Sequence, residues 1–239
     1  MAITFTNQGA SANPDFLDRA NAASYVTPAG GWTPPTTGII GLWVFNWIAA
    51  IGNVPTVSGN GVTWVQVATV AVDPGTSERI TLFGAFAAGA TAGQTTINFA
   101  AQTQLGCDCH FFQITGADES GTIANAFVQT PNANGTGTAS SVTLAAAGHA
   151  DNRPISAHSH LANEVTTPRT NWTEFDDFNS AGPNAGGEDQ VRSDAFETTA
   201  SASWATSVAW LAMAAEVKAA VAGGAATHLG WYQSSGGWF

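Results

Sequence analysis

The residues best suited to acid–base chemistry lie in one short acidic segment, Glu174-Phe175-Asp176-Asp177-Phe178-Asn179. Side chains two positions apart on a strand point to the same face of a sheet. An extended segment would therefore present Glu174 and Asp176 together. A pair of carboxylates is what a glycoside hydrolase needs, one as the general acid and the other as the nucleophile or base. The spacing keeps glycan hydrolysis as one hypothesis.

This segment resembles the Glu-x-Asp-x-x-Glu strand of laminarinase-like glucanases, which are jelly-roll proteins. The resemblance implies catalytic roles for Glu174 and Asp176. The chain departs from the family pattern at Asn179, which stands where the family has its general acid. The alternative interpretation is a solvated turn that follows a tryptophan-containing strand, and we favour it because the proton donor is missing. We therefore expect no catalytic residue here.

A second set of residues has metal-ligand chemistry. Cys107 and Cys109 alternate along one predicted strand, and His158 and His160 alternate along another. Each pair then shares a face, and the four side chains would surround a zinc ion if the two strands were neighbours. Zinc cysteines are usually separated by two to four residues, however, and a cysteine in a buried strand behaves as a small hydrophobic residue. We predict no metal and keep these four as the candidate ligands.

Signatures of other enzyme classes are missing from the sequence. It contains no Gly-x-Ser-x-Gly nucleophile elbow, no Gly-x₄-Gly-Lys phosphate loop and no dinucleotide fingerprint after a strand. Lys218 is the only lysine, which leaves little scope for Schiff-base or phosphoryl chemistry. We expect neither an enzymatic activity nor a cofactor.

Tryptophan is abundant, with nine residues in the chain. Flat aromatic side chains stack on sugars and also anchor protein interfaces. Four tryptophans in apolar or repeated segments are predicted to lie in the core: Trp43, Trp47, Trp64 and Trp172. The candidates for an exposed docking role are Trp32, beside Gly31, and the aromatic residues of a Gly/Ala-rich C-terminal tail, Trp231, Tyr232, Trp238 and Phe239. We favour docking onto protein, with the tail packed on its own domain or on a neighbouring subunit.

The charge balance excludes several partners. Six Lys and Arg residues face 17 Asp and Glu residues, a net charge of −11, and only 10% of the residues are charged. A nucleic-acid partner needs a basic stripe, which is absent. The longest apolar stretch, 39–51, is shorter than the roughly 20 residues that span a bilayer. Residues 1–20 lack a basic start followed by an apolar run, so we expect no secretory signal and synthesis in a cytoplasm.

The elements that must position these residues are predicted to be strands. Apolar residues recur with a period of two between clusters of Gly, Pro, Asn and Asp, which is typical of all-β proteins. Strands are expected near residues 39–49, 62–71, 78–87, 94–100, 107–115, 122–130, 140–146, 154–162, 171–176, 189–198 and 204–217. A short helix is expected at 13–23, where Asn13-Pro14-Asp15 forms an N-terminal cap. The Ala-rich segment 213–222 is assigned to a strand, with a helix as the alternative.

A weak internal repeat appears at an offset of 108 residues, the separation of Trp64 and Trp172. Residues 61–67 align with residues 169–175, and the order of predicted strands continues in step on both sides. A duplicated Greek-key unit predicts a two-sheet β-sandwich of jelly-roll type. The alternative is that unrelated hairpins with a tryptophan look alike. The expected organisation is an N-terminal extension at 1–38, a sandwich domain at 39–218 and the tail at 219–239.

Several segments together resemble, in their spacing, virion structural proteins of tailed bacteriophages: 58–64, 78–86, 93–99, 111–118 and 201–204. The phage proteins with this spacing are minor tail and head-surface proteins. The resemblance implies a non-enzymatic exterior head decoration, cement or minor tail subunit, located in the virion after synthesis in the host cytoplasm. Its partners would be copies of itself, in a homo-oligomer such as a trimer, and the major capsid or tail proteins, without nucleic acid or membrane. A carbohydrate-binding module for host attachment is the second hypothesis, and the glucanase the third.

Overall fold

The computed structural model describes residues 2–8, 16–18, 20–28, 32–48, 53–72, 77–180 and 184–221. In these ranges the regular structure is β apart from one short 3₁₀ helix, η1 (Ile123–Ala126). The strands of the first half of the chain are β1 (Thr4–Asn7), β2 (Phe16–Asp18), β3 (Ser24–Val26), β4 (Ile39–Ile48), β5 (Thr56–Gly59), β6 (Val65–Val72), β7 (Ser77–Phe86), β8 (Thr95–Asn98) and β9 (Gly106–Thr115). Those of the second half are β10 (Phe127–Gln129), β11 (Asn132–Thr143), β12 (Arg153–His160), β13 (Thr167–Pro168), β14 (Thr173–Ser180), β15 (Ala185–Val191) and β16 (Thr199–Val217).

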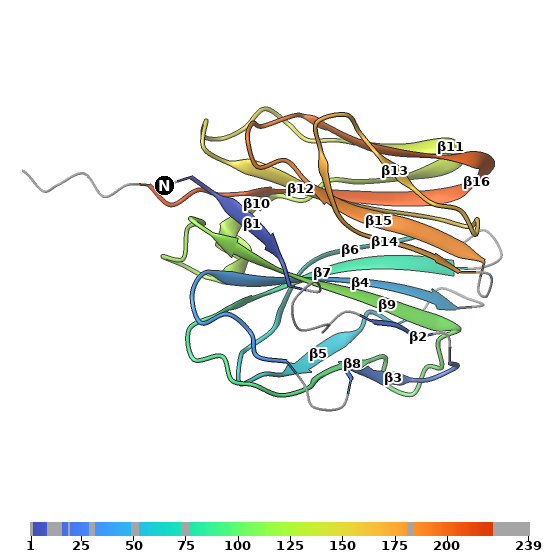
Figure 1. Ribbon diagram of the computed structural model, residues 1–239, viewed down its shortest axis with the longest axis horizontal. Coiled ribbons are helices and arrows are strands. Elements are labelled where there is room, and N and C mark those ends of the chain that lie inside the picture. Colours follow the sequence, from blue (N-terminus) through green and yellow to red (C-terminus); the bar gives the residue numbers. More distant parts are fainter. Residues whose placement is uncertain are drawn as a thin grey trace, which may run out of the picture.

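These strands form two main sheets and a small one. The first main sheet has the order β1-β9-β4-β7-β6, and β2 also pairs with β9. The second has the order β10-β16-β12-β15-β14, and β11 and β13 also pair with β16. The small sheet has the order β3-β8-β5. Figure 1 shows the layers, with the small sheet below the first main sheet and the second main sheet above it.

The strand β4 explains why the layers stack in this way. One face of β4 carries Trp43, Phe45 and Trp47, which belong to the apolar cluster between the two main sheets. Its other face carries Leu42 and Val44, which pack toward the small sheet. Because both faces are covered, every position of the strand is buried and the sequence is apolar on both faces, with Asn46 as its one polar residue, instead of alternating.

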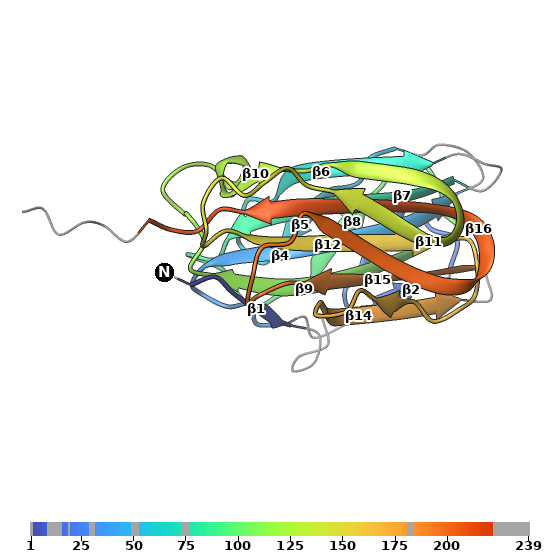
Figure 2. The ribbon, with the colours of Figure 1, turned by 90° about the horizontal axis from the view of Figure 1, so that it is seen from above.

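The second main sheet is covered on its outer face by its own strands. Gly137 of β11 pairs with Val208 of β16, whereas Ala139 pairs with Ser203, so β16 has extra residues at this point and both strands bend. Beyond the bend, three segments form what we call the outer flap. The segment 199–203 pairs with residues 139–143 on one side and with residues 167–168 on the other. Its apolar side chains pack against the same cluster as Trp172. Figure 2 shows the long bent β11 and β16 from this side.

The internal repeat predicted from the sequence is present in the structure. The order β9-β4-β7-β6 of the first half recurs as β16-β12-β15-β14 in the second. The outer strands β6 and β14 each carry a register shift, between Gln66 and Ala68 and between Glu174 and Asp176. The extra residues, Val67 and Phe175, are 108 positions apart. The two halves thus share one strand order, and the outer flap occupies in the second half the place that the small sheet has in the first.

The predicted all-β sandwich is confirmed, although it has three sheets instead of two, and the jelly-roll assignment stays a prediction. The strand predicted at 189–198 exists but its bounds are wrong, because β15 runs from Ala185 to Val191 and the following loop is held by ion pairs from Arg192 to Asp194 and Glu197. The helix predicted at 13–23 is wrong where it is described, since residues 16–18 pair with β9. Residues 4–7, 16–18 and 24–26, assigned above to the N-terminal extension, are strands of the sheets.

Candidate functional site

The predicted carboxylate pair of a glucanase is not formed. On β14, Glu174 lies opposite Gln190 of β15, and Asp176 lies opposite Asp189. Successive residues of β15 point to opposite faces, and residues opposite each other across a ladder share a face. The bulge at Phe175 therefore places Glu174 and Asp176 on opposite faces of the sheet. The glucanase hypothesis therefore lacks the carboxylate pair that would flank one bond, and the expectation of no catalytic residue stays a prediction.

The fold brings Glu188, which is not part of the acidic segment 174–179, next to Glu174. Glu188 lies opposite Asp177 on the outer face of the second main sheet. It is fully buried, and its two carboxylate oxygens have no hydrogen-bond partner among the described residues. Burial above all, then the charges of Glu174, Asp189 and Asp177, raises the pKa of Glu188 to about 9. The side chain is therefore protonated at neutral pH, and nothing in the local Gly-Gly-Glu sequence signals this burial.

The predicted metal ligands are also kept apart. Cys107 and Cys109 belong to the cluster between the first main sheet and the small sheet. His158 faces the outer flap, where its Nδ1 lies 2.7 Å from the Ser140 Oγ. Both main sheets therefore lie between the cysteines and the pair His158 and His160. The four candidate ligands therefore do not meet, and the described residues contain no group of three His, Cys, Asp or Glu side chains placed to hold a metal.

The two histidines are instead neutral parts of the packing below the outer flap. Burial lowers the pKa of His158 to about 3, and burial, opposed by the charge of Glu164, lowers that of His160 to about 4. His160 stacks on Trp204 with ring centroids 4.3 Å apart. Both imidazoles are uncharged at neutral pH.

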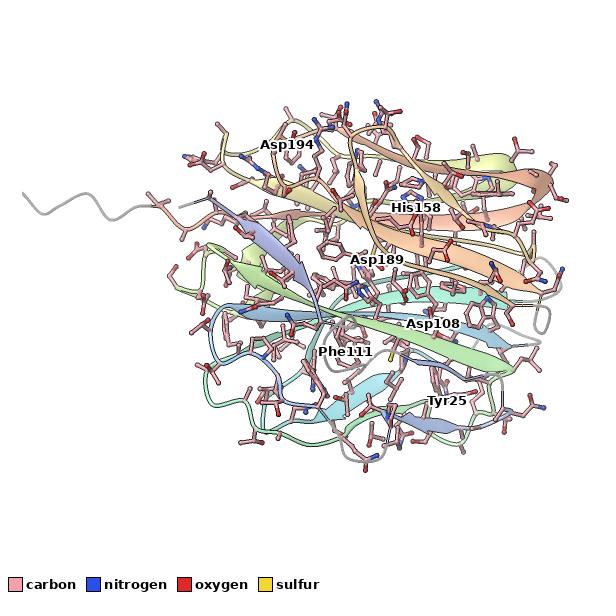
Figure 3. All side chains as sticks on the ribbon, in the orientation of Figure 1. Tyr25, Asp108, Phe111, His158, Asp189 and Asp194 are labelled. Carbon is pink, nitrogen blue, oxygen red and sulfur yellow. The ribbon has the colours of Figure 1, made fainter. Side chains whose placement is uncertain are left out.

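Polar groups also join the two main sheets across the core. His110 of β9 and Asp189 of β15 approach to 2.8 Å between Nδ1 and Oδ1. Figure 3 shows Asp189 between the main sheets and His158 farther out, in the second sheet. Near one end of the sandwich, Glu78 of β7 accepts hydrogen bonds from Trp47 Nε1 at 2.7 Å and from Ser159 Oγ at 3.1 Å. These contacts fix how one unit sits on the other.

The predicted docking residue Trp32 is buried, with 3% of its surface exposed. Its Nε1 donates a hydrogen bond to Thr95 Oγ1 at 3.3 Å, and its ring lies 5.0 Å from that of Phe111. The prediction that Trp32 is an exposed anchor is wrong, because the small sheet and the first main sheet close around it. The other predicted anchors lie outside the described residues: Trp231, Tyr232, Trp238 and Phe239.

The last described residues after β16, 218–221, are held firmly by the sandwich, and we call them the chain exit. After β16, the backbone of Lys218 accepts a hydrogen bond from Asp118 N at 2.8 Å, and Ala220 N donates to Gly116 O at 2.8 Å. The side chains of Lys218 and Asp118 form an ion pair at 2.7 Å. Hydrogen bonds from Lys218 and Ser120 hold the pKa of Asp118 well below its ordinary value. Backbone bonding thus fixes the chain up to Ala220.

A buried carboxylate anchors the same region from inside. Glu216, 1% exposed, accepts hydrogen bonds from Gly148 N at 2.9 Å and from the side chains of Asn152 and Gln129. Asn152 Oδ1 in turn accepts from Ala219 N at 2.9 Å. The loop around residues 148–152 is therefore tied to the exit of the chain.

Two surface cavities flank this exit. The first, of about 280 Å³, is lined mainly by apolar surface and includes Val128, His149 and Val221. The second, of about 400 Å³, includes Asp118, Glu119 and Val221. Val221 is 74% exposed and Val128 is 47% exposed, so two apolar side chains face solvent beside the cavities. The chain exit is thus the candidate docking site of the described structure.

Comparisons with known proteins add no relative. No protein-family model, curated protein or solved structure gives a significant match to this chain. Among the described residues, no helix has the length and apolar character needed to cross a membrane.

Proposed function

We propose that this chain is a non-enzymatic structural subunit of a bacteriophage virion, on the head exterior or in the tail, where it stabilises the particle through contacts between subunits. The chain exit is the observation that carries the proposal. The sandwich holds its backbone up to Ala220 between two cavities. The segment beyond it, 222–239, contains Trp231, Tyr232, Trp238 and Phe239.

This arrangement suits a subunit that links to its neighbours. A Gly- and Ala-rich spacer gives reach, and buried aromatic side chains supply the largest contributions to binding at protein interfaces. A fixed exit point limits the orientations from which the segment starts, which reduces the entropy lost on docking. The net charge of −11 favours a place away from the DNA, because like charges repel.

The rival hypotheses lose the residues on which they depended. Glu174 and Asp176 lie on opposite faces of β14, so the glucanase hypothesis lacks its carboxylate pair. Trp32 is buried, so the carbohydrate-binding hypothesis lacks an exposed tryptophan ring at this position on which a sugar could stack. Neither hypothesis is favoured by another described residue.

The test is an inventory of virions by mass spectrometry. Particles of the phage that encodes this chain are purified after complementation with the full chain, or with a chain ending at Val221. We expect the full chain in the particles and the shortened chain only in the lysate. Circular dichroism provides the folding control, because every hydrogen bond described at the exit is retained by the shortened chain. Absence of the full chain from virions, or normal incorporation of the shortened one, would refute the proposal.

A variant with Trp231, Tyr232, Trp238 and Phe239 changed together to Ala keeps the length of the segment and removes its rings. It should behave like the shortened chain if the aromatic side chains carry the contact. Normal incorporation of this variant would show that the rings are not the anchors.

A further inference from the structure

The duplicated units differ at their outer strands. β14 is the edge of the second main sheet, and β6 is the equivalent edge of the first. β14 carries Glu174, Asp176 and Asp177 among its eight residues. β6 has the sequence Val-Gln-Val-Ala-Thr-Val-Ala-Val, without a charge or a proline. Because both units have the same strand order, the strand order does not explain why β14 is charged and β6 is not.

Charges and prolines are how proteins stop an exposed strand edge from pairing with another chain. The β14 edge has the charges, and the side chain of Asn7 also donates a hydrogen bond to the Phe175 carbonyl at its bulge. No described strand pairs with the outer edge of β6. A long uncharged strand rich in valine is a site of intermolecular pairing when its edge is bare.

The neighbouring layer is equally uncharged on this side. Residues 132–137 of β11 pair with β16 only, and their sequence, Asn-Ala-Asn-Gly-Thr-Gly, contains no ionisable group. β6 lies close to both β11 and β16, and Figure 2 shows β6 and β11 along the same long side of the molecule. We call β6 together with residues 132–137 the uncharged side.

We propose that β6 pairs antiparallel with β6 of a second copy of this chain, across a two-fold axis, so that the first main sheets of the two copies become continuous. The inference deepens the proposed function and rests on it, since it names the surface through which one subunit meets another. The regular stretch of β6 that follows the bulge, from Ala68 to Val72, is the segment that would form the new ladder.

The lack of charge on β6 permits a second copy as the occupant, and the symmetry of an antiparallel pair favours it. Two molecules of net charge −11 repel each other over most of their surfaces. The uncharged side adds no repulsion where the two copies would touch. Antiparallel pairing about a two-fold axis brings the same strand from both partners together, so a second copy supplies a matching edge. Self-pairing of β14 would instead bring Asp176 and Asp177 of two chains together, which is unfavourable.

Sedimentation velocity of the full chain over a range of concentrations tests the inference. The variant Ala71→Asp places a carboxylate on β6, beside Arg79 on the neighbouring strand. Ala71→Ser is the uncharged control at the same position. Val165→Asp introduces the same charge at a residue that is 60% exposed in a loop outside β6. We expect dimers for the full chain and both controls, and at least tenfold weaker dimerisation for Ala71→Asp.

Cysteine scanning of residues 68–71 provides a second readout that does not depend on affinity. Cys107 and Cys109 are fully buried, so they should stay unreactive in the folded protein. A single cysteine introduced next to the two-fold axis should form a disulfide with the same cysteine of the second copy. A cysteine introduced at Val165 should not. Two results would overturn the inference. One is a full chain that stays monomeric at all concentrations. The other is a dimer that Ala71→Asp does not weaken and that no cysteine introduced in β6 cross-links.

The chain ending at Val221 separates this inference from the proposed function. If β6 makes the contact, the shortened chain dimerises as well as the full chain, whatever its fate in virions. If dimers disappear with residues 222–239, the second copy is held by the tail and the β6 inference is wrong. If dimers form through β6 but the full chain is absent from virions, the proposed function fails and the dimer stands.

Discussion

The substitution Glu78→Gln should reduce the loss of stability that the protein shows as the pH rises from 4.5 to about 8. Glu78 is 1% exposed in the core between the main sheets. Its Oε1 accepts hydrogen bonds from Trp47 and Ser159, and its Oε2 has no partner among the described residues. Burial, opposed by these two hydrogen bonds, raises its pKa from 4.5 to about 8. Glutamine keeps an acceptor oxygen for both donors and cannot ionise.

The magnitude follows from proton linkage. The unfolded chain releases the Glu78 proton near pH 4.5, whereas the folded chain keeps it up to about pH 8. Between these values the folded state binds more protons, so its stability is full below pH 4.5 and falls as the pH rises through this window. A single group contributes at most about 1.4 kcal/mol per pH unit, and the whole shift corresponds to about 5 kcal/mol.

Urea unfolding followed by tryptophan fluorescence at pH 5, 6, 7 and 8, at constant ionic strength, measures the effect. The readout is the difference in unfolding free energy between Glu78→Gln and wild type, which should grow in favour of the variant as the pH rises. A constant offset carries no information, because the buried amide NH₂ adds a pH-independent penalty of about 1–3 kcal/mol. Glu119→Gln, at an exposed carboxylate, is the matched control. Parallel pH profiles for Glu78→Gln and wild type would refute the reasoning.

Other substitutions test the remaining buried groups. Trp32→Ala should lower the unfolding free energy by about 3–5 kcal/mol in urea titrations, because it empties a core site; a change below 1 kcal/mol would contradict its burial. Gly41→Ala should destabilise by about 1–3 kcal/mol, since its Cβ would lie 2.2 Å from the Phe112 ring, whereas Gly93→Ala has open space and should change the melting temperature little. Glu188→Gln should flatten the loss of stability between pH 5 and 9, because burial raises the pKa of this carboxyl to about 9; an unchanged slope would show that it is hydrated.

Strands with a strong apolar signal were predictable from the sequence. The predicted strand at 39–49 matches β4 (Ile39–Ile48), because a core between two layers demands apolar side chains on both faces. β15 was missed at its start, because Gly186 and Gly187 are poor strand formers. The structure needs them there, since a Cβ would meet the Glu164 and His158 carbonyl oxygens at 2.5 and 2.4 Å. That requirement comes from other parts of the chain and leaves no local pattern.

The candidate site was predictable only in part, for two physical reasons. The faces of Glu174 and Asp176 follow from alternation only in a regular strand, and the bulge at Phe175 reverses one of them. The glycine beside Trp32 predicts an exposed position, but the burial of Trp32 depends on the small sheet that packs over it. The repeat is recognisable from the sequence because Trp64 and Trp172 stand at equivalent places in the aligned segments 61–67 and 169–175, and the neighbouring strands follow in the same order.

The differences between the two units have one consequence for assembly. The contacts His110–Asp189 and Glu78–Ser159 each take one residue from the first unit and one from the second. The interface inside the chain is therefore between unlike surfaces, although the units share a topology. The same divergence leaves β6 uncharged and β14 acidic. Pairing of β6 with β14 of the next copy would grow into a filament, whereas pairing of β6 with β6 about a two-fold axis closes after a single contact. Dimers that do not extend further are thus what the divergence of the two edges predicts.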